Sequence, residues 1–207
     1  MPGIQEQIDM LAMLSAKGEI KLVQQIIDAG IDVNGKDSKK DWTPLMAAAA
    51  NGHLDTARCL IRSGADVNLD CEGTTPLAKA VLNGDHSMAE LLIEEGAVVN
   101  IKTPGGTPVL FAAIHSGNID LVRLMVEKGA DVNIANKEGI TALTFTCMQG
   151  ELKIAEELLK NNAAINAKSA GGQTPLYAAY YTNNQELVHL LKQYGAAEKE
   201  KTQRSGR

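Results

Sequence analysis

The residues that could carry out catalysis or bind a metal are few in this chain of 207 residues. Four histidines are candidates: His53, His86, His115 and His189. They are scattered along the chain, and it contains no His-Glu-x-x-His or Cys-x-x-Cys motif. The adjacent carboxylates Glu94-Glu95 and Glu156-Glu157 fall on expected helix surfaces, whereas a catalytic pair needs burial and separated pKa values. The sequence therefore predicts no catalytic residue, no metal site and no cofactor.

Three cysteines remain as possible nucleophiles or redox groups. Cys59 and Cys147 lie at interior positions of expected helices, where a thiol packs as a small apolar group. Cys71 lies beside Glu72 at the tip of an expected loop, so we expect an exposed thiol whose pKa is raised by the carboxylate. Three scattered cysteines cannot form a disulfide framework. A reducing compartment is therefore expected, the cytoplasm or, in a eukaryote, also the nucleus.

Charge and hydropathy argue against two classes of partner. The net charge is −5, whereas a nucleic-acid-binding protein normally carries a basic surface. No apolar run approaches the roughly 18 residues that a membrane-spanning helix needs. The first residues are acidic and lack the basic segment of a signal peptide. We expect no nucleic-acid partner and no membrane association.

One short phrase recurs along the chain and indicates how its elements are organised. Gly-Ala-Asp-Val-Asn occurs at 64–68 and 129–133, and imperfect copies occur at 30–34, 96–100 and 162–166. The final asparagines of these copies are 34, 32, 33 and 33 residues apart. Such a period is typical of repeat proteins, in which each unit buries its apolar face against its neighbours. The low aromatic content of 3% beside 44% apolar residues fits thin layers of small side chains.

Each repeat predicts two helices and one projecting loop, which we call a finger. A Thr-Pro pair, as in Thr75-Pro76, can cap the first helix, and Pro at the first helical position loses no hydrogen bond. The first helix ends at a Gly, such as Gly84, and a second helix with apolar residues at helical spacing follows. It ends at Gly or Asn, such as Gly96 or Asn162, residues that tolerate a left-handed backbone. The Asp-Val-Asn segment then leads into the finger.

This pattern closely resembles the ankyrin repeat, in which a Thr-Pro-Leu-His helix start, a Gly-His loop and a Gly-Ala-Asp-Val-Asn segment recur. The resemblance implies an all-α solenoid of stacked helix-loop-helix units with projecting β-hairpin fingers. We expect about six repeats and a tail, with these boundaries: an N-terminal capping repeat at 1–37, repeats at 38–70, 71–102, 103–135 and 136–168, a C-terminal capping repeat at 169–197, and a charged, disordered tail at 198–207.

Three departures from the family pattern affect individual repeats. The His after Thr-Pro-Leu is absent, and Met46, Ala78, Thr144 and Tyr177 occupy its place. Its hydrogen bonds must be replaced or missing. Thr107-Pro108 lies one residue further from the following Gly than in the other repeats, so an irregular helix start is expected there. The first finger is one residue longer than the later ones.

The resemblance also implies a binding surface, formed by the fingers and the exposed side of the first helices on the concave face. The residues at these positions are our candidates for contact with a partner: Lys39, Lys40, Trp42, Asn51, Glu72, Thr74, Leu82, Asn83, His115, Ser116, Met148, Gln149 and Tyr181. Trp42 is the single tryptophan of the chain, and tryptophan is enriched in interface hot spots. Alternatively, Trp42 covers the apolar edge of the first two repeats.

The sequence thus predicts a monomeric, non-enzymatic module that binds a partner protein through its concave face, as a scaffold, an inhibitor or a sequestering protein. The alternative is an enzyme or redox-sensing protein with a site in the repeat groove. A deep polar pocket with perturbed titratable groups would distinguish that alternative from a shallow groove.

Overall fold

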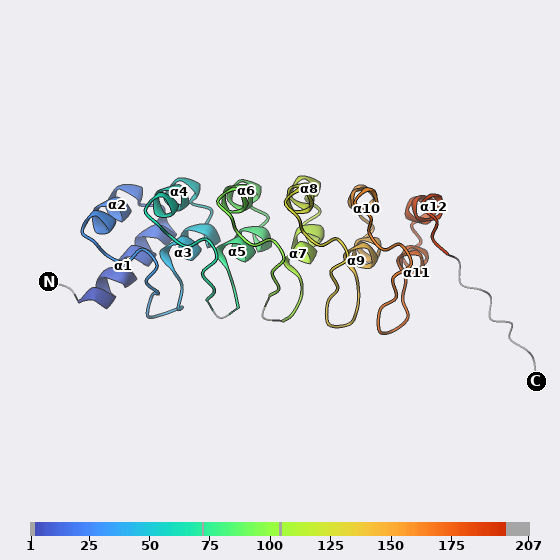
Figure 1. Ribbon diagram of the computed structural model, residues 1–207, viewed down its shortest axis with the longest axis horizontal. Helices are drawn as coiled ribbons and strands as arrows, with labels where there is room; N and C mark the ends of the chain where they lie inside the picture. Colours follow the sequence, from blue (N-terminus) through green and yellow to red (C-terminus); the bar gives the residue numbers. More distant parts are fainter. Residues whose placement is uncertain (1–2, 72, 104, 198–207) are drawn as a thin grey trace, which may run out of the picture. The chain divides into compact units, whose positions relative to one another are not determined.

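The computed structural model describes residues 3–71, 73–103 and 105–197, which form two compact units. Figure 1 shows their helices in chain order. The first unit, Met1–Ala130, contains α1 (Ile4–Lys17), α2 (Ile20–Asp28), α3 (Pro44–Ala50), α4 (Leu54–Arg62), α5 (Pro76–Leu82), α6 (His86–Glu94), α7 (Val109–His115) and α8 (Ile119–Glu127). The second unit, Asp131–Arg207, contains α9 (Ala142–Gln149), α10 (Leu152–Lys160), α11 (Pro175–Tyr181) and α12 (Gln185–Gln193). The expected disordered tail at 198–207 lies outside the described residues.

Threonine caps start most of the first helices, as the sequence predicts. The Thr43 hydroxyl accepts a hydrogen bond from the Met46 amide at 3.2 Å, and Thr75 does the same for Ala78. In α7 the cap position is occupied by Pro108, which has no hydroxyl, and no side chain caps this helix. The irregular start expected at Thr107-Pro108 is therefore confirmed, and it arises because the Thr-Pro pair is displaced by one residue.

The missing family histidine is replaced differently in different repeats. Met46 and Ala78 are buried, so apolar packing takes the place of the hydrogen bonds. In α9 the buried Thr144 hydroxyl lies 3.1 Å from that of Thr141, which restores one polar contact between turn and helix. Tyr177 in the last repeat is 42% exposed instead.

Both series of helix-ending residues adopt the left-handed backbone that the sequence predicts. After the second helices, Gly129 follows α8 with φ of +91°, and Asn162 takes the equivalent place after α10 with φ of +64°. After the first helices, Gly150 follows α9 with φ of +81°, and Asn183 takes the equivalent place after α11 with φ of +53°. Asparagine is among the few residues with a side chain that visit this region readily. The two-helix period therefore continues through the repeats in which glycine is absent.

In each unit the helices form two layers (Figure 1). In the first unit α1, α3, α5 and α7 pack in sequence, while α2, α4, α6 and α8 pack behind them. In the second unit α9 packs against α11, and α10 against α12. Fully buried leucines and methionines fill the interfaces, among them Leu45, Leu60 and Leu92, and small alanines such as Ala48 allow close approach. Within the described residues, no helix is long and apolar enough to cross a membrane.

The repeated asparagines join consecutive repeats. The Asn68 amide donates to the Gly96 carbonyl at 3.0 Å, and its side-chain oxygen accepts from the Val98 amide at 2.8 Å. Asn34 bonds in the same way to the segment at 64–66, and Asn133 to the segment at 162–164. Because the partners lie about one repeat further on, the constant spacing of the asparagines follows from the stacking of the repeats.

The fingers differ in how they are closed. Isolated antiparallel bridges close the fingers before α7 and α9, between Lys102 and Pro108 and between Ala135 and Thr141, while Cys71 pairs with Thr74 across a tight turn. The first finger closes through the Asp37 amide, which donates to the Trp42 carbonyl at 2.9 Å. The projecting fingers are thus confirmed, with isolated bridges in place of long hairpin strands among the described residues.

Candidate functional site

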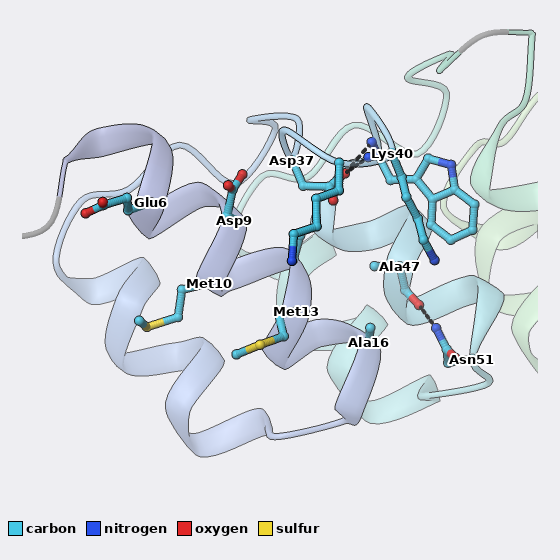
Figure 2. A pocket seen from close by; sticks show the side chains of 12 residues that line it. Glu6, Asp9, Met10, Met13, Ala16, Asp37, Lys40, Ala47 and Asn51 are labelled. Carbon is cyan, nitrogen blue, oxygen red and sulfur yellow. Dashed lines mark hydrogen bonds between the residues drawn. The ribbon is translucent and has the colours of Figure 1, made fainter.

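A groove of about 380 Å³ lies between α1, α3 and the first finger, residues 36–42 (Figure 2). We call it the N-terminal groove. Its lining residues are Glu6, Asp9, Met10, Ala12, Met13, Ala16, Asp37, Lys39, Lys40, Trp42, Ala47 and Asn51. Helix α1 has 14 residues, twice as many as α3, so its N-terminal half extends alongside the finger and forms one wall.

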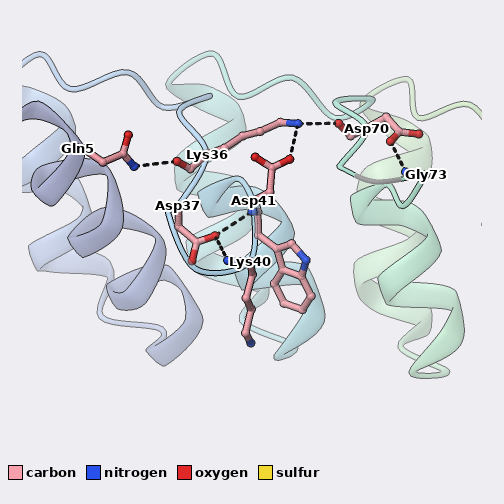
Figure 3. A network of polar contacts seen from close by, with 8 residues as sticks. Gln5, Lys36, Asp37, Lys40, Asp41, Asp70 and Gly73 are labelled. Carbon is pink, nitrogen blue, oxygen red and sulfur yellow. Dashed lines mark hydrogen bonds and ion pairs between the residues drawn. The ribbon is translucent and has the colours of Figure 1, made fainter.

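The Asp37 carboxylate holds the first finger in shape. It accepts hydrogen bonds from the Trp42 amide at 2.8 Å and from the Lys40 amide at 3.3 Å (Figure 3). Together with the backbone bond from Asp37 to Trp42, these contacts close the loop on itself. The positions from which Lys40 and Trp42 project are therefore set before any partner binds.

The finger is also anchored on both sides. On the α1 side, Asp9 accepts hydrogen bonds from the Ser38 amide at 2.8 Å and from the Ser38 hydroxyl at 2.5 Å, and these bonds lower the pKa of Asp9. On the other side, the Lys36 ammonium bonds to Asp41 at 3.0 Å and to the Asp70 carbonyl at 3.2 Å, as Figure 3 shows. The Asp41 contact raises the pKa of Lys36. The groove wall is thus attached to its neighbours.

The Trp42 indole is partly buried and lies close to two lysine side chains. The Lys40 ammonium is 4.4 Å from the ring centroid, and the Lys79 ammonium, from α5, is 4.5 Å from it. At exposed sites each such cation–π contact contributes about 0.5–1 kcal/mol. Trp42 therefore contacts the next repeat, and it also lines the groove with its remaining surface.

Two methionines on α1 add an apolar surface that the sequence interpretation missed. Met10 and Met13 are 44% and 47% exposed, and both line the groove. With Glu6 and Lys17 they fall at helical spacing on the exposed stripe of α1. That spacing was a usable signal, because two methionines aligned with charged residues indicate an apolar patch on a solvent-facing stripe.

The candidate residues from the sequence do not form one site. Lys39, Lys40, Trp42 and Asn51 meet in the N-terminal groove. Outside its lining, but still in the first unit, lie Thr74, Leu82, Asn83, His115 and Ser116. The Asn83 amide donates to the Ala50 carbonyl at 2.7 Å, so this side chain joins two repeats. Glu72 lies outside the described residues.

The remaining candidates, Met148, Gln149 and Tyr181, belong to the second unit. Tyr181 is 83% exposed and stacks on Tyr177 with ring centroids 6.4 Å apart, while Met148 is 41% exposed. The second unit therefore also exposes large apolar side chains.

The cysteines lack the environment of reactive thiols. Burial raises the pKa of Cys147 to about 12 and also raises that of Cys59. The expectation that Cys71 is exposed is wrong, because its residue surface is only 2% exposed. Lys36 of the preceding finger bonds to the carbonyl of the adjacent Asp70 at 3.2 Å, and burial raises the pKa of Cys71. No cluster of three potential metal ligands occurs in the described part of the chain.

Thiol labelling tests this environment. At a pH of about 8, iodoacetamide should modify Cys59, which is partly exposed, before Cys71 and Cys147 in the folded protein. We expect Cys147 to react at least about 100-fold more slowly than in urea, because burial suppresses its thiolate. Mass spectrometry of the labelled peptides gives the three rates, and equal rates in urea are the control. Labelling of Cys147 as fast as Cys59 would contradict the burial described here.

Comparison with known proteins adds independent information. The family model for ankyrin repeats (3 copies) matches residues 10–103 and 107–203. The human ankyrin repeat domain-containing protein 40 is 36% identical over 61 residues, which are 30% of this chain and 17% of that protein. Ankyrin repeat and KH domain-containing protein mask-1 of Caenorhabditis elegans is 41% identical over 63 residues, 30% of this chain and 2% of that protein. The matches thus span a small part of these relatives.

Among solved structures, the crystal structure of the human ASB11 ankyrin repeat domain superposes with a TM-score of 0.74 at 26% identity. The superposition covers 92% of this chain and 85% of the other. The all-α ankyrin-repeat solenoid expected from the sequence is confirmed by this match and by the family model.

Proposed function

The chain belongs to the ankyrin-repeat family, whose members are generally protein–protein interaction modules, and from this premise we propose that it binds a partner protein in the N-terminal groove. We further propose that the protein is monomeric, non-enzymatic and cytoplasmic, and that it acts as a scaffold, an inhibitor or a sequestering protein. Neither a nucleic acid nor a membrane is the partner proposed, since the net charge is −5 and the groove carries both signs of charge.

The observation that carries the proposal is an exposed apolar surface beside a finger that is held by hydrogen bonds. Met10, Met13 and Trp42 present apolar surface to the groove, and the Asp37 and Asp9 hydrogen bonds fix the finger beside them. A preorganised surface loses less conformational entropy on binding, so more of the contact energy contributes to affinity. Tryptophan in such a setting is a typical hot spot.

The alternative of an enzyme finds less support in the same groove. Among the described residues that line it there is no histidine, cysteine or serine to act as a nucleophile or as its base. The carboxylates of Asp9 and Asp37 accept internal hydrogen bonds, and the lowered pKa of Asp9 is unsuited to a general acid near neutral pH. These features favour a binding surface over a catalytic site.

Affinity capture tests the proposal. The chain is immobilised as wild type, Trp42→Ala, Met13→Ser and Tyr181→Ala, and proteins captured from a lysate of the producing cells are quantified by mass spectrometry. We expect at least one protein whose recovery falls about tenfold with Trp42→Ala and with Met13→Ser, because each substitution removes apolar contact in the groove. Its recovery should be unchanged with Tyr181→Ala, which removes an exposed aromatic ring of the second unit.

Arg58→Ala, an exposed change on α4, is the matched control, and circular dichroism verifies that every variant is folded. If recovery depends on Tyr181 alone, the binding surface lies in the second unit and the proposal for the N-terminal groove is wrong. If neither Trp42→Ala nor Met13→Ser changes the recovery of any captured protein, the N-terminal groove is not the binding site.

A further inference from the structure

Two lysines beside Trp42 carry charge that the described residues do not compensate. Both ammonium groups lie within 4.5 Å of the same ring centroid, so they can be at most about 9 Å apart, near the screening length of about 8 Å at physiological salt. Neither Lys40 nor Lys79 forms an ion pair with a carboxylate in the described part of the chain. Two like charges are therefore held at the Trp42 ring: Lys40 lines the groove, and Lys79 lies beside it, outside the lining residues.

The carboxylates of the groove, in contrast, already have donors. Asp37 accepts from the backbone of the first finger, and Asp9 accepts from Ser38 and from Gln5 at 2.9 Å. Glu6 accepts from the Gly3 amide at 2.9 Å at the start of α1. The acidic groups thus stabilise the walls, whereas the ammonium groups of Lys40 and Lys79 keep donors for an incoming ligand.

Apolar surface continues from these cations toward α1. Met10 and Met13 line the same groove as Lys40 and Trp42 (Figure 2). A ligand that contacts both the apolar side chains and the two ammonium groups needs an apolar side chain next to a negatively charged one. An ammonium group held over an aromatic face has three donors, and its hydrogen bonds to a carboxylate are charge-assisted and therefore strong.

We infer that the occupant of the N-terminal groove is an acidic protein segment, in which an apolar side chain contacts Met13 and Trp42 while neighbouring Asp or Glu carboxylates pair with Lys40 and Lys79. This inference rests on the proposed function and adds the chemical class of the partner. Complementary charge supplies selectivity and faster association, and the apolar contact supplies most of the affinity.

Selection from a phage-displayed library of short random peptides tests the inference with the full chain. Peptides selected by the wild type should be enriched in Asp and Glu next to Leu, Ile, Met or Phe. A synthetic copy of a selected peptide, measured by fluorescence polarisation, should bind about tenfold or more weakly to Lys40→Glu/Lys79→Glu. It should also bind more weakly as ionic strength rises from about 0.01 M to about 0.15 M, since the Debye length falls from about 30 to about 8 Å.

The matched control is Lys21→Glu/Lys153→Glu, which makes the same change in net charge at exposed positions of α2 and α10. This control should bind the peptide with unchanged affinity. If it weakens binding as much as Lys40→Glu/Lys79→Glu, the effect comes from overall charge and the inference is overturned.

The remaining outcomes separate this inference from the proposed function. If peptide binding requires Trp42 but the peptides show no enrichment in Asp and Glu, only the acidic class of the partner is overturned. The same holds if Lys40→Glu/Lys79→Glu leaves the affinity for the peptide unchanged. Selection of no peptide, or of peptides whose binding survives Trp42→Ala, overturns the groove as a docking site as well. A dimer of the free chain in sedimentation that dissociates with Trp42→Ala would identify a second copy as the occupant and overturn the inference.

Discussion

Replacing Leu60 with alanine is expected to lower the free energy of unfolding by about 3 kcal/mol. Leu60 has no exposed surface and lies in α4, which packs against both α2 and α6. The substitution removes buried methyl groups and leaves a cavity, and such changes typically cost about 2–5 kcal/mol. In a repeat protein the loss also weakens the interfaces on both sides of the altered repeat.

The same chemical change at an exposed position provides the control. Leu82 ends α5 and is 54% exposed, so Leu82→Ala should change the free energy of unfolding by less than about 1 kcal/mol. Denaturant titration followed by circular dichroism measures both variants under the same conditions. Equal losses in the two variants would mean that the burial of Leu60 does not determine the stability of this region.

The second large effect is expected for Gly129→Val, with a loss of about 2 kcal/mol in the free energy of unfolding. Gly129 has φ of +91°, and an added Cβ would meet no heavy atom within 4 Å. The cost therefore comes from the backbone, since a β-branched residue is strongly disfavoured at positive φ. The Gly129 carbonyl also accepts the Asn100 amide at 3.0 Å, so a shifted backbone disturbs the link between repeats.

Gly129→Asn separates conformation from side-chain size. Asn162 occupies the equivalent position of the next repeat with φ of +64°, so the asparagine variant should lose clearly less stability than the valine variant. Thermal and denaturant unfolding of the two variants give the comparison. A valine variant within about 0.5 kcal/mol of wild type, the range of ordinary surface changes, would contradict the strain argument.

The elements could be predicted from the sequence because their signals are local. A threonine hydroxyl reaches an amide three residues away, as Thr43 does for Met46, and a left-handed residue ends the helix in which it lies. The irregular start of α7 could be predicted from the displaced Thr107-Pro108 pair for the same reason. The period then followed from the repetition of these signals. The repeat boundaries drawn from the sequence stay predictions.

The candidate site was only partly predictable. Family resemblance selected Lys39, Lys40, Trp42 and Asn51, which do line one groove, but it spread the other candidates along two units. Met10 and Met13 were missed because the first repeat lacks the Thr-Pro-Leu motif from which positions in the other repeats were assigned. Cys71 was assigned to the surface because a finger tip normally faces solvent, but its residue surface is only 2% exposed, and Lys36 of the preceding finger bonds to the adjacent Asp70 carbonyl.

The sequence by itself determined the type of each element, because helix caps and helix ends depend on contacts within a few residues. The recurrence of these local signals then gave the family and the repeating register. The tertiary structure alone decided which side chains meet. Lys79 reaches the Trp42 ring from α5, and Asp9 holds Ser38 from α1, so both contacts join residues about one repeat apart. Such contacts depend on how side chains of successive repeats pack, which the local pattern does not encode. The N-terminal groove and the pair of lysines at the Trp42 ring are products of that packing.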